Sequence, residues 1–425
     1  MNENNKKIYA WAFYDWANSA YAASVMAAFF PVFFREYWNG DDDASQSTFK
    51  LGIANSLSSL VVVIIAPILG AIADQGGTRR QFLFTFAFLG ILMTGCLYMV
   101  ERGDWMLAMM VYVLATIGFS ASNTFYDSLL VDIATADKVD FVSAFGYSLG
   151  YLGGGLLFAF NVYMVISPHT FNLPDSAAAV RYSFLGVALW WALFSIPIFL
   201  FVKEKPRKTR RKGWSAITGG YRQLSQTFSQ VRQLRATLLF LVAYWLYIDG
   251  VDTIVRMAVD YGLALGFASN SLLVALGITQ FVGFPAAIIF GKIGERMGAR
   301  TGIFIGLGVY AGTTLWGYFM QDVWEFYILA VSIGLVQGGV QALSRSLYSR
   351  LIPRNKAAEF FGFYNMLGKF AAVIGPALMG WVGVMTGAPR ASILSLILLF
   401  AAGGFLLARV DIDSGQRAAR ALEEH

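Results

Sequence analysis

The sequence predicts an all-α integral membrane protein whose twelve transmembrane helices form two pseudo-symmetric six-helix bundles. Three observations support this prediction: an apolar composition, apolar stretches about 20 residues long that recur along the chain, and an uneven distribution of basic residues between alternate loops. An internal repeat then divides the predicted helices into two sets of six.

The composition is that of a membrane protein. Hydrophobic residues make up 57% and charged residues 14% of the 425 positions, against about 45–50% and about 25% in soluble domains. One cysteine, Cys96, excludes an intramolecular disulfide, and with only His169 and His425 a histidine or cysteine metal cluster is excluded as well. We therefore expect no metal, no cofactor and no enzymatic activity.

The predicted spans follow the apolar stretches between Gly, Pro and charged breaks. The first stretch is too long for a signal peptide and contains Asp15 and Asn18, so it is kept as a span. The twelve predicted spans are 8–35, 50–73, 82–100, 105–131, 141–165, 181–202, 236–262, 268–290, 302–320, 325–350, 357–386 and 390–409.

The basic residues predict the orientation. With the amino terminus inside, the cytoplasmic segments hold 25 of the 32 Lys and Arg residues and the outer loops only five. Positive charge accumulates in cytoplasmic loops, so both termini are expected in the cytoplasm, and the protein in the cytoplasmic membrane if the source is bacterial. The basic residues that give the chain its net charge of +6 lie between apolar spans, and this distribution argues against nucleic-acid binding.

The longest polar connection divides the chain. We expect an N-terminal six-helix bundle over 1–202, a basic cytoplasmic linker over 203–235, and a C-terminal six-helix bundle with a short cytoplasmic tail over 236–425. The basic run in the linker is interpreted as a topology and lipid-headgroup anchor, with a regulatory site as the alternative.

A repeated turn links the two halves. Gly, three residues, an acid, four residues and Arg occur as Gly70-Asp74-Arg79 and again, half a chain later, as Gly291-Glu295-Arg300. A second repeated pair, Ser128-Leu129 and Ser346-Leu347, has nearly the same separation along the chain. The carboxylate can bind helix amides or an arginine, so these turns are candidate gate loops, with a purely topological role as the alternative. The candidate gate residues are Gly70, Asp74, Arg79, Arg80, Gly291, Glu295 and Arg300.

This turn resembles the signature loop of the major facilitator superfamily. The resemblance to that superfamily covers essentially the whole chain. The run Tyr14-Asp-Trp-Ala-Asn-Ser-Ala-Tyr21, the glycine-rich stretch 146–155 and Gln341-Ala-Leu-Ser-Arg345-Ser resemble the unknown major facilitator family, which includes the autophagy-related vacuolar amino-acid effluxers. The resemblance implies the major facilitator fold and export or exchange of amino acids or similar solutes. The chain departs from the family pattern at Asp127, where an amide is expected, so an added carboxylate changes the charge of this segment.

Charged and amide side chains occur inside the apolar spans. A charge at the centre of a span costs about 2.5–3.5 kcal/mol, so each one needs a partner, water or a function. In span seven Asp249, Asp252, Arg256 and Asp260 fall on one helical face, and some of them can pair in the helix. Spans one, four and ten carry further polar faces, and in the resembled fold spans one, four, seven and ten line the cavity. The candidate cavity and coupling residues are Asp15, Asn18, Asn123, Asp127, Tyr247, Asp249, Asp252, Arg256, Gln337, Gln341, Arg345 and Lys369.

Small residues predict close helix packing. Gly146, Gly150 and Gly154 recur every four residues in span five, and span eleven contains Gly375-Pro376. We expect these positions to allow close contact between the two halves.

The hypothesis that fits these features is a secondary active transporter that works by alternating access. It would move a small polar or zwitterionic solute, such as an amino acid, a short peptide or a cell-wall fragment, across the bilayer as a monomer. A proton is favoured as the coupling ion and sodium is the alternative. A broad-specificity drug exporter and, from another class, a membrane receptor are the alternative functions.

Overall fold

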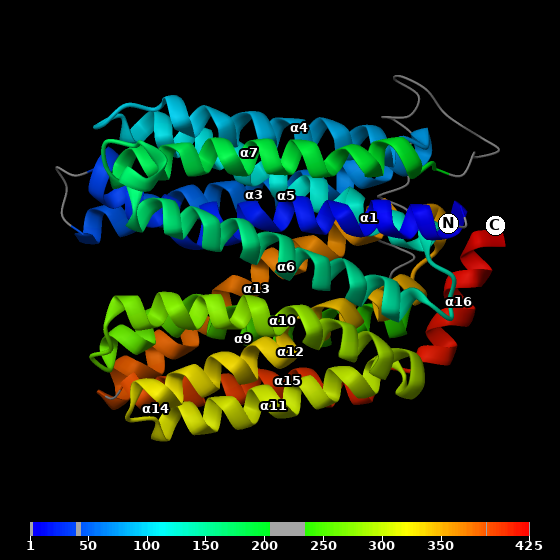
Figure 1. Ribbon diagram of the computed structural model, residues 1–425. Helices are drawn as coiled ribbons and strands as arrows, with labels where there is room; N and C mark the ends of the chain where they lie inside the picture. Colours follow the sequence, from blue (N-terminus) through cyan, green and yellow to red (C-terminus); the bar gives the residue numbers. More distant parts are fainter. Residues whose placement is uncertain (1–2, 40–43, 205–233, 388, 425) are drawn as a thin grey trace.

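The computed structural model describes residues 3–39, 44–204, 234–387 and 389–424, and these ranges are almost entirely helical (Figure 1). The first long helix runs from Glu3 to Trp38 and comprises α1 (Glu3–Ala20), α2 (Phe30–Phe33) and the wider π-helical turns after each. The other N-terminal helices are α3 (Ala44–Gly76), α4 (Arg79–Cys96), α5 (Trp105–Ile133), α6 (Val139–Ile166) and α7 (Ser176–Phe201). The C-terminal helices are α9 (Arg235–Ala264), α10 (Ser269–Met297), α11 (Ala299–Phe319), α12 (Val323–Arg350), α13 (Ala357–Thr386), α14 (Pro389–Leu394), α15 (Leu396–Ala408) and α16 (Ile412–Glu424).

These helices make a multi-pass integral membrane protein. Within the described ranges, 11 helical segments are long and apolar enough to cross a bilayer. The remaining predicted span, 302–320, corresponds to α11, whose glycines and threonines lower its hydropathy; it packs along α12 and α15 like its neighbours. Large apolar side chains such as Phe84, Leu189 and Val384 face outwards, as expected for surfaces solvated by lipid.

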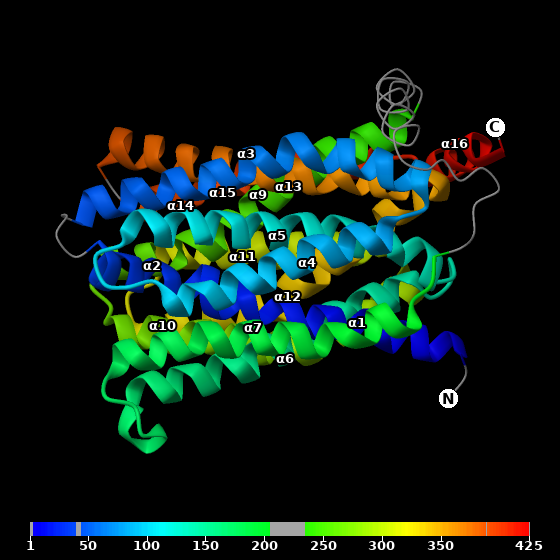
Figure 2. The ribbon, with the colours of Figure 1, turned by 90° about the horizontal axis from the view of Figure 1, so that it is seen from above.

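The described helices form two groups that lie side by side. In Figure 1 the helices from α1 to α7 occupy one side and those from α9 to α15 the other, and the view in Figure 2 shows both groups running along the same axis. Each group has its own apolar core. Contacts between the groups are made chiefly by α3 with α13 and by α6 with α10.

Both chain termini lie at one end of the helix bundle, which is called the termini end here; the opposite end is called the far end (Figure 1). The two groups meet closely at the termini end, where Gly70 of α3 contacts the backbone of Ala358 and Gly294 of α10 contacts Asp140. A Cβ at Gly70 would overlap the Ala358 carbonyl, so glycine is required for this approach. The termini end is therefore closed.

The two repeated turns share a backbone feature that the charged motif alone did not predict. Gly77 follows α3 with φ +58° and Gly298 follows α10 with φ +84°. Glycine adopts these left-handed conformations without a Cβ clash, and the two glycines are separated along the chain by the same offset as the two copies of the motif. The repeat thus fixes the chain reversal as well as the charged residues.

The predicted role of the span-five glycines is wrong in one respect. Gly146, Gly150 and Gly154 do allow close packing, but their partner is α1 of the same half: a Cβ at Gly150 would lie 2.6 Å from Ser19 Oγ. Gly375, next to Pro376 inside α13, packs on Thr253 of α9, also within one half. Contact between the halves instead uses Gly70, Gly291, Gly294 and Gly362.

The C-terminal segment differs from the predicted tail. It forms α16, which lies across the termini end of the bundle (Figure 1). Its Gly415 packs against Leu351 and Ala236, so the helix is attached to the ends of α12 and α9. Residues 205–233 of the predicted linker lie outside the part of the chain that the structure describes.

Candidate functional site

A buried arginine from one half is held by two carboxylates from the other. Arg345 of α12 is 1% exposed, and its Nη1 donates to Asp127 Oδ1 of α5 at 2.9 Å. Its Nη2 lies 3.5 Å from Asp15 Oδ2 of α1. Arg345 also donates to Ser143 of α6, from Nε to the side-chain hydroxyl and from Nη2 to the carbonyl, each at 2.9 Å. We call Arg345, Asp15, Asp127 and Ser143 the Arg345 cluster.

Neighbouring side chains complete the hydrogen bonds of the two acids. The Tyr126 hydroxyl donates to Asp15 Oδ2 at 2.8 Å, and Asn365 of α13 donates to Asp127 Oδ2 at 3.3 Å. The guanidinium also lies over the aromatic rings of Trp11 and Tyr147, at 4.8 Å and 4.4 Å from their centroids. Such contacts stabilise a desolvated cation. The cluster therefore binds one positive group with two negative ones in a site that excludes bulk water.

The position of this cluster follows from the repeat. Asp127 and Arg345 differ by 218 in residue number, the same offset that relates Ser128-Leu129 to Ser346-Leu347. Equivalent residues of two pseudo-symmetric halves can touch only next to the axis that relates the halves. The ion pair consequently marks the centre of the interface. Sequence reasoning named both residues but not their pairing, and it missed Tyr126, Ser143 and Asn365.

A second set of contacts joins the halves at the α3–α4 turn. Asp74 is fully buried and accepts from Arg79 Nε at 2.7 Å. It also accepts from the backbone N–H of Glu359 at 2.9 Å, at the first turn of α13 in the other half. Arg79 Nη2 donates to the carbonyl of Arg354 at 2.8 Å, and Nη1 lies 3.2 Å from Asp132. These residues are called the Asp74 latch.

In the Asp74 latch, the carboxylate of Asp74 caps the N-terminus of α13. A carboxylate at a helix N-terminus satisfies free N–H groups and interacts favourably with the helix dipole. Here the acid comes from one half and the helix from the other, so the cap holds the two halves together. Arg80 takes no part in it, because its contacts are with Val202 and Glu204 of its own half.

The second copy of the turn behaves differently. Glu295 is exposed, and Arg300 donates to the carbonyl of Val410 within the C-terminal half. The acid that joins the halves here is Asp140 at the start of α6, which accepts from Ser346 at 2.6 Å and from Arg350 at 2.7 Å. The repeat predicted the position of this contact but not the residue that makes it.

Asp249 lies apart from the Arg345 cluster. It is fully buried and accepts from the backbone N–H groups of Gly375 at 2.9 Å and Ile374 at 3.1 Å, and from Thr253 at 3.3 Å. These partners are backbone amides and a hydroxyl, whereas the sequence pattern allowed ion pairs within the helix. A proline distorts the turn that precedes it, and Asp249 binds the backbone next to Pro376.

The other predicted cavity residues fall into four groups. Asn18 donates to Asn123 at 2.6 Å, which joins α1 to α5. Tyr247 is fully buried inside the C-terminal half and shares a hydrogen bond with Ser344. The side chain of Arg256 lies outside the described residues, as does that of Asp260. The remaining candidates are half-buried and lie farther from the termini end than Arg345: Gln337, Gln341, Asp252 and Lys369.

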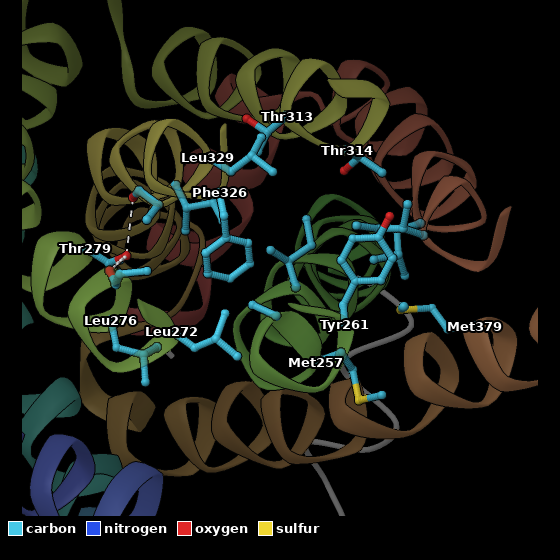
Figure 3. Close-up of a pocket in the computed structure, with 17 residues that line it drawn as sticks. Met257, Tyr261, Leu272, Leu276, Thr279, Thr313, Thr314, Phe326, Leu329 and Met379 are labelled. Atoms are coloured by element: carbon cyan, nitrogen blue, oxygen red, sulfur yellow. Dashed lines mark hydrogen bonds between the residues drawn. The ribbon is translucent and has the colours of Figure 1, made fainter. Parts of the chain in front are cut away.

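Two cavities occur among the described residues, one inside the C-terminal half and one between the halves. An apolar cavity of about 60 Å³ lies inside the C-terminal half, between residues such as Met257, Tyr261, Leu272, Phe326 and Met379 (Figure 3). It is too small for an amino acid and does not touch the interface. A polar cavity of about 880 Å³ lies at the termini end between the halves, and its lining includes Asp137, Asp140, Glu295, Arg350 and Arg420.

Comparison with known proteins agrees with this architecture. A family profile described as "Vacuole effluxer Atg22 like" matches residues 43–420. The chain is 39% identical over 412 residues to the uncharacterized MFS-type transporter YxiO of Bacillus subtilis (strain 168), covering 96% of each protein. It is 26% identical over 455 residues to autophagy-related protein 22 of Yarrowia lipolytica, covering 87% of this chain and 76% of that protein.

A solved structure supports the fold. The human organic anion transporter MFSD10 superposes with a TM-score of 0.73 at 14% identity, over 96% of this chain and all of that one. The predicted major facilitator fold is confirmed. This chain belongs to the Atg22-like family and is an MFS-type transporter rather than an enzyme.

Proposed function

We propose that the protein is a secondary active transporter for a small polar or zwitterionic solute and that it works by alternating access. The moving units are residues 1–202 and 236–425, and the termini end faces the cytoplasm. The distribution of Lys and Arg supports this orientation, since 25 of the 32 lie in segments assigned to that side. In this view the structure is the state closed to the cytoplasm, in the cytoplasmic membrane if the source is bacterial.

The observation that carries the proposal is the Arg345 cluster. A buried ion pair is costly to break, about 3–5 kcal/mol when one partner is removed, so the halves separate only when something replaces the lost contacts. A zwitterionic solute carries both replacements: its ammonium group can pair with Asp15 or Asp127, and its carboxylate with Arg345. An amino acid, a short peptide or a cell-wall fragment has this chemistry, whereas a lipophilic cation has no anionic group for Arg345.

The charge of the cluster supports proton coupling. Arg345 contributes one positive charge and the two carboxylates two negative charges, which leaves one excess negative charge in a buried site. A proton on either acid balances the site, as a sodium ion would. We favour the proton because the acids already accept from Tyr126, Asn365 and Arg345 and offer few free oxygen lone pairs to a metal ion.

The Asp74 latch acts as the cytoplasmic gate in this mechanism. Opening at the termini end removes Asp74 from the first turn of α13 and Arg79 from the Arg354 carbonyl. Both groups then become hydrated, so the latch can break without leaving a buried unpaired charge. The latch and the Arg345 cluster open together because both join the same two halves.

Proteoliposomes test the proposal. The purified protein is screened for thermal stabilisation by amino acids, short peptides, cell-wall fragments and lipophilic dyes, and a stabilising solute is then used for uptake under an imposed pH or sodium gradient. We expect proton-driven accumulation by wild type. Asp127→Asn should lose accumulation and retain solute exchange, because the cluster is then neutral without a proton. Asp413→Asn, an exposed acid on α16, is the control.

Each contrary result has a distinct meaning. Wild-type accumulation by Asp127→Asn would remove the Arg345 cluster from coupling. Accumulation driven by sodium alone would replace the proton as the coupling ion. Stabilisation and transport of dyes, with no response to any zwitterion, would support the drug-exporter alternative.

A further inference from the structure

We propose that α16 is an intrachain clasp that stabilises the closed state of the termini end. The helix lies across the ends of the bundle rather than along it (Figure 1). Its fixed side belongs to the C-terminal half: Gly415 contacts Leu351 and Ala236, and Ala419 is 2% exposed. A helix attached this firmly moves with the C-terminal half when the halves separate.

A chain of hydrogen bonds joins α16 to the Asp74 latch through one residue. Glu423 Oε1 accepts from the backbone N–H of Arg354 at 2.6 Å. The carbonyl of Arg354 accepts from Arg79 Nη2, and Arg79 in turn binds Asp74. Glu423 therefore fixes the segment between α12 and α13 that presents the carbonyl to the N-terminal half. Without Glu423, the Arg354 carbonyl is held less firmly in the position where it accepts from Arg79.

The second face of α16 borders the other half. Gln416, Ala419, Arg420 and Glu423 line the 880 Å³ cavity, whose opposite wall is the α5–α6 turn with Asp137 and Asp140. Val131 of the N-terminal half belongs to the apolar core against which Ile412 and Leu422 pack. Val131 and the α16 residues thus line one cavity between the halves, and separating the halves would widen it.

The cavity occupies the position that the repeat relates to the Asp74 latch. Glu295, the counterpart of Asp74, is one of its lining residues and is exposed, so this acid does not cap a helix of the other half. The clasp covers the side of the termini end that contains the polar cavity. Both sides of the termini end are then held, one by the latch and one by α16.

The clasp rests on the proposed alternating access, since it biases the equilibrium between the two states. Its test reads conformation directly and needs no solute. Spin labels are placed at Lys138 and Arg296, two exposed residues on opposite halves at the termini end, in a Cys96→Ser background. Distance distributions are measured by pulsed electron paramagnetic resonance in liposomes for wild type, a chain truncated after Val410, Glu423→Ala and Asp413→Asn. Alanine removes the acceptor of the Arg354 N–H.

We expect truncation to raise the ratio of long to short distances by about two- to tenfold, the change expected from losing a few weak contacts. Glu423→Ala should give part of this rise, and Asp413→Asn none. An unchanged two-distance equilibrium in the truncated chain would overturn the clasp and leave alternating access standing. If truncation prevents folding, a wild-type distribution in Glu423→Ala overturns the clasp. One invariant distance in every variant would overturn both proposals.

Discussion

Replacing Arg345 with Gln removes the cation of the Arg345 cluster and leaves Asp15 and Asp127 facing the same buried site. Glutamine keeps some hydrogen-bonding capacity towards Ser143, so the change is mainly one of charge. Two carboxylates without a counter-ion repel each other and are poorly solvated. We therefore expect the closed state to be destabilised relative to the state in which water reaches the acids.

The size of the effect follows from the contacts. At an effective dielectric constant of about 20, the N–O distances of 2.9 Å and 3.5 Å correspond to gross attractions of about 6 and about 5 kcal/mol. Desolvation offsets much of this, and removing one partner of a buried pair costs about 3–5 kcal/mol net. The ratio of open to closed molecules should rise by a factor of roughly 10² to 10⁴.

The assay combines the spin-label distance between Lys138 and Arg296 with a double-mutant cycle. Arg345→Gln is compared with Asp127→Asn and with the double variant, which restores part of the charge balance. A coupling free energy of about 1.5 kcal/mol or more is expected for a close charge pair. A closed-state population in Arg345→Gln equal to that of wild type, or a coupling energy near zero, would refute the electrostatic account of the interface.

Three further predictions concern single contacts. Asp74→Asn should favour opening by about 1–2 kcal/mol in the same distance assay, because it weakens the cap of α13, while its repeat counterpart Glu295→Gln should have no effect since that acid is exposed. Gly150→Val should lower the melting temperature because its Cβ would contact Ser19, whereas Gly308→Ala, which meets no atom within 4 Å, should melt as wild type. Asp249→Asn should cost about 1–3 kcal/mol in thermal unfolding, since the amide nitrogen cannot accept from the α13 backbone.

The fold could be predicted from the sequence because a bilayer imposes strong constraints. Every span must be helical, apolar and about 20 residues long, so its existence can be read from composition alone. The span at 302–320 was predicted as well, although the glycines of α11 reduce its hydropathy, and its exposed Leu315 and Phe319 face outwards like those of the other spans. The helix α16 could not be found in this way, because its apolar residues pack on the ends of other helices rather than in lipid.

The residues of the site were predicted better than their partners. Asp15, Asp127 and Arg345 could be identified because a charged side chain inside a membrane span has a high free-energy cost, whichever helix carries it. Their pairing depends on the angle between two halves and is not a local property. Applying the 218-residue offset of Ser128-Leu129 and Ser346-Leu347 to Asp127 would have found Arg345, and two positions related by the repeat can touch when they lie next to the axis. Asp249 was harder, since its partners are backbone amides that carry no signal in the sequence.

The meeting of Asp127 and Arg345 at the pseudo-twofold axis also restricts which bundles can assemble. In a symmetric pair made from two copies of one half, the residue at this place would face its own duplicate, either two carboxylates or two guanidinium groups. Like charges enclosed at van der Waals distance oppose association. Each bundle therefore repels a copy of itself and attracts the other, so electrostatics at one buried point selects the mixed pair during assembly.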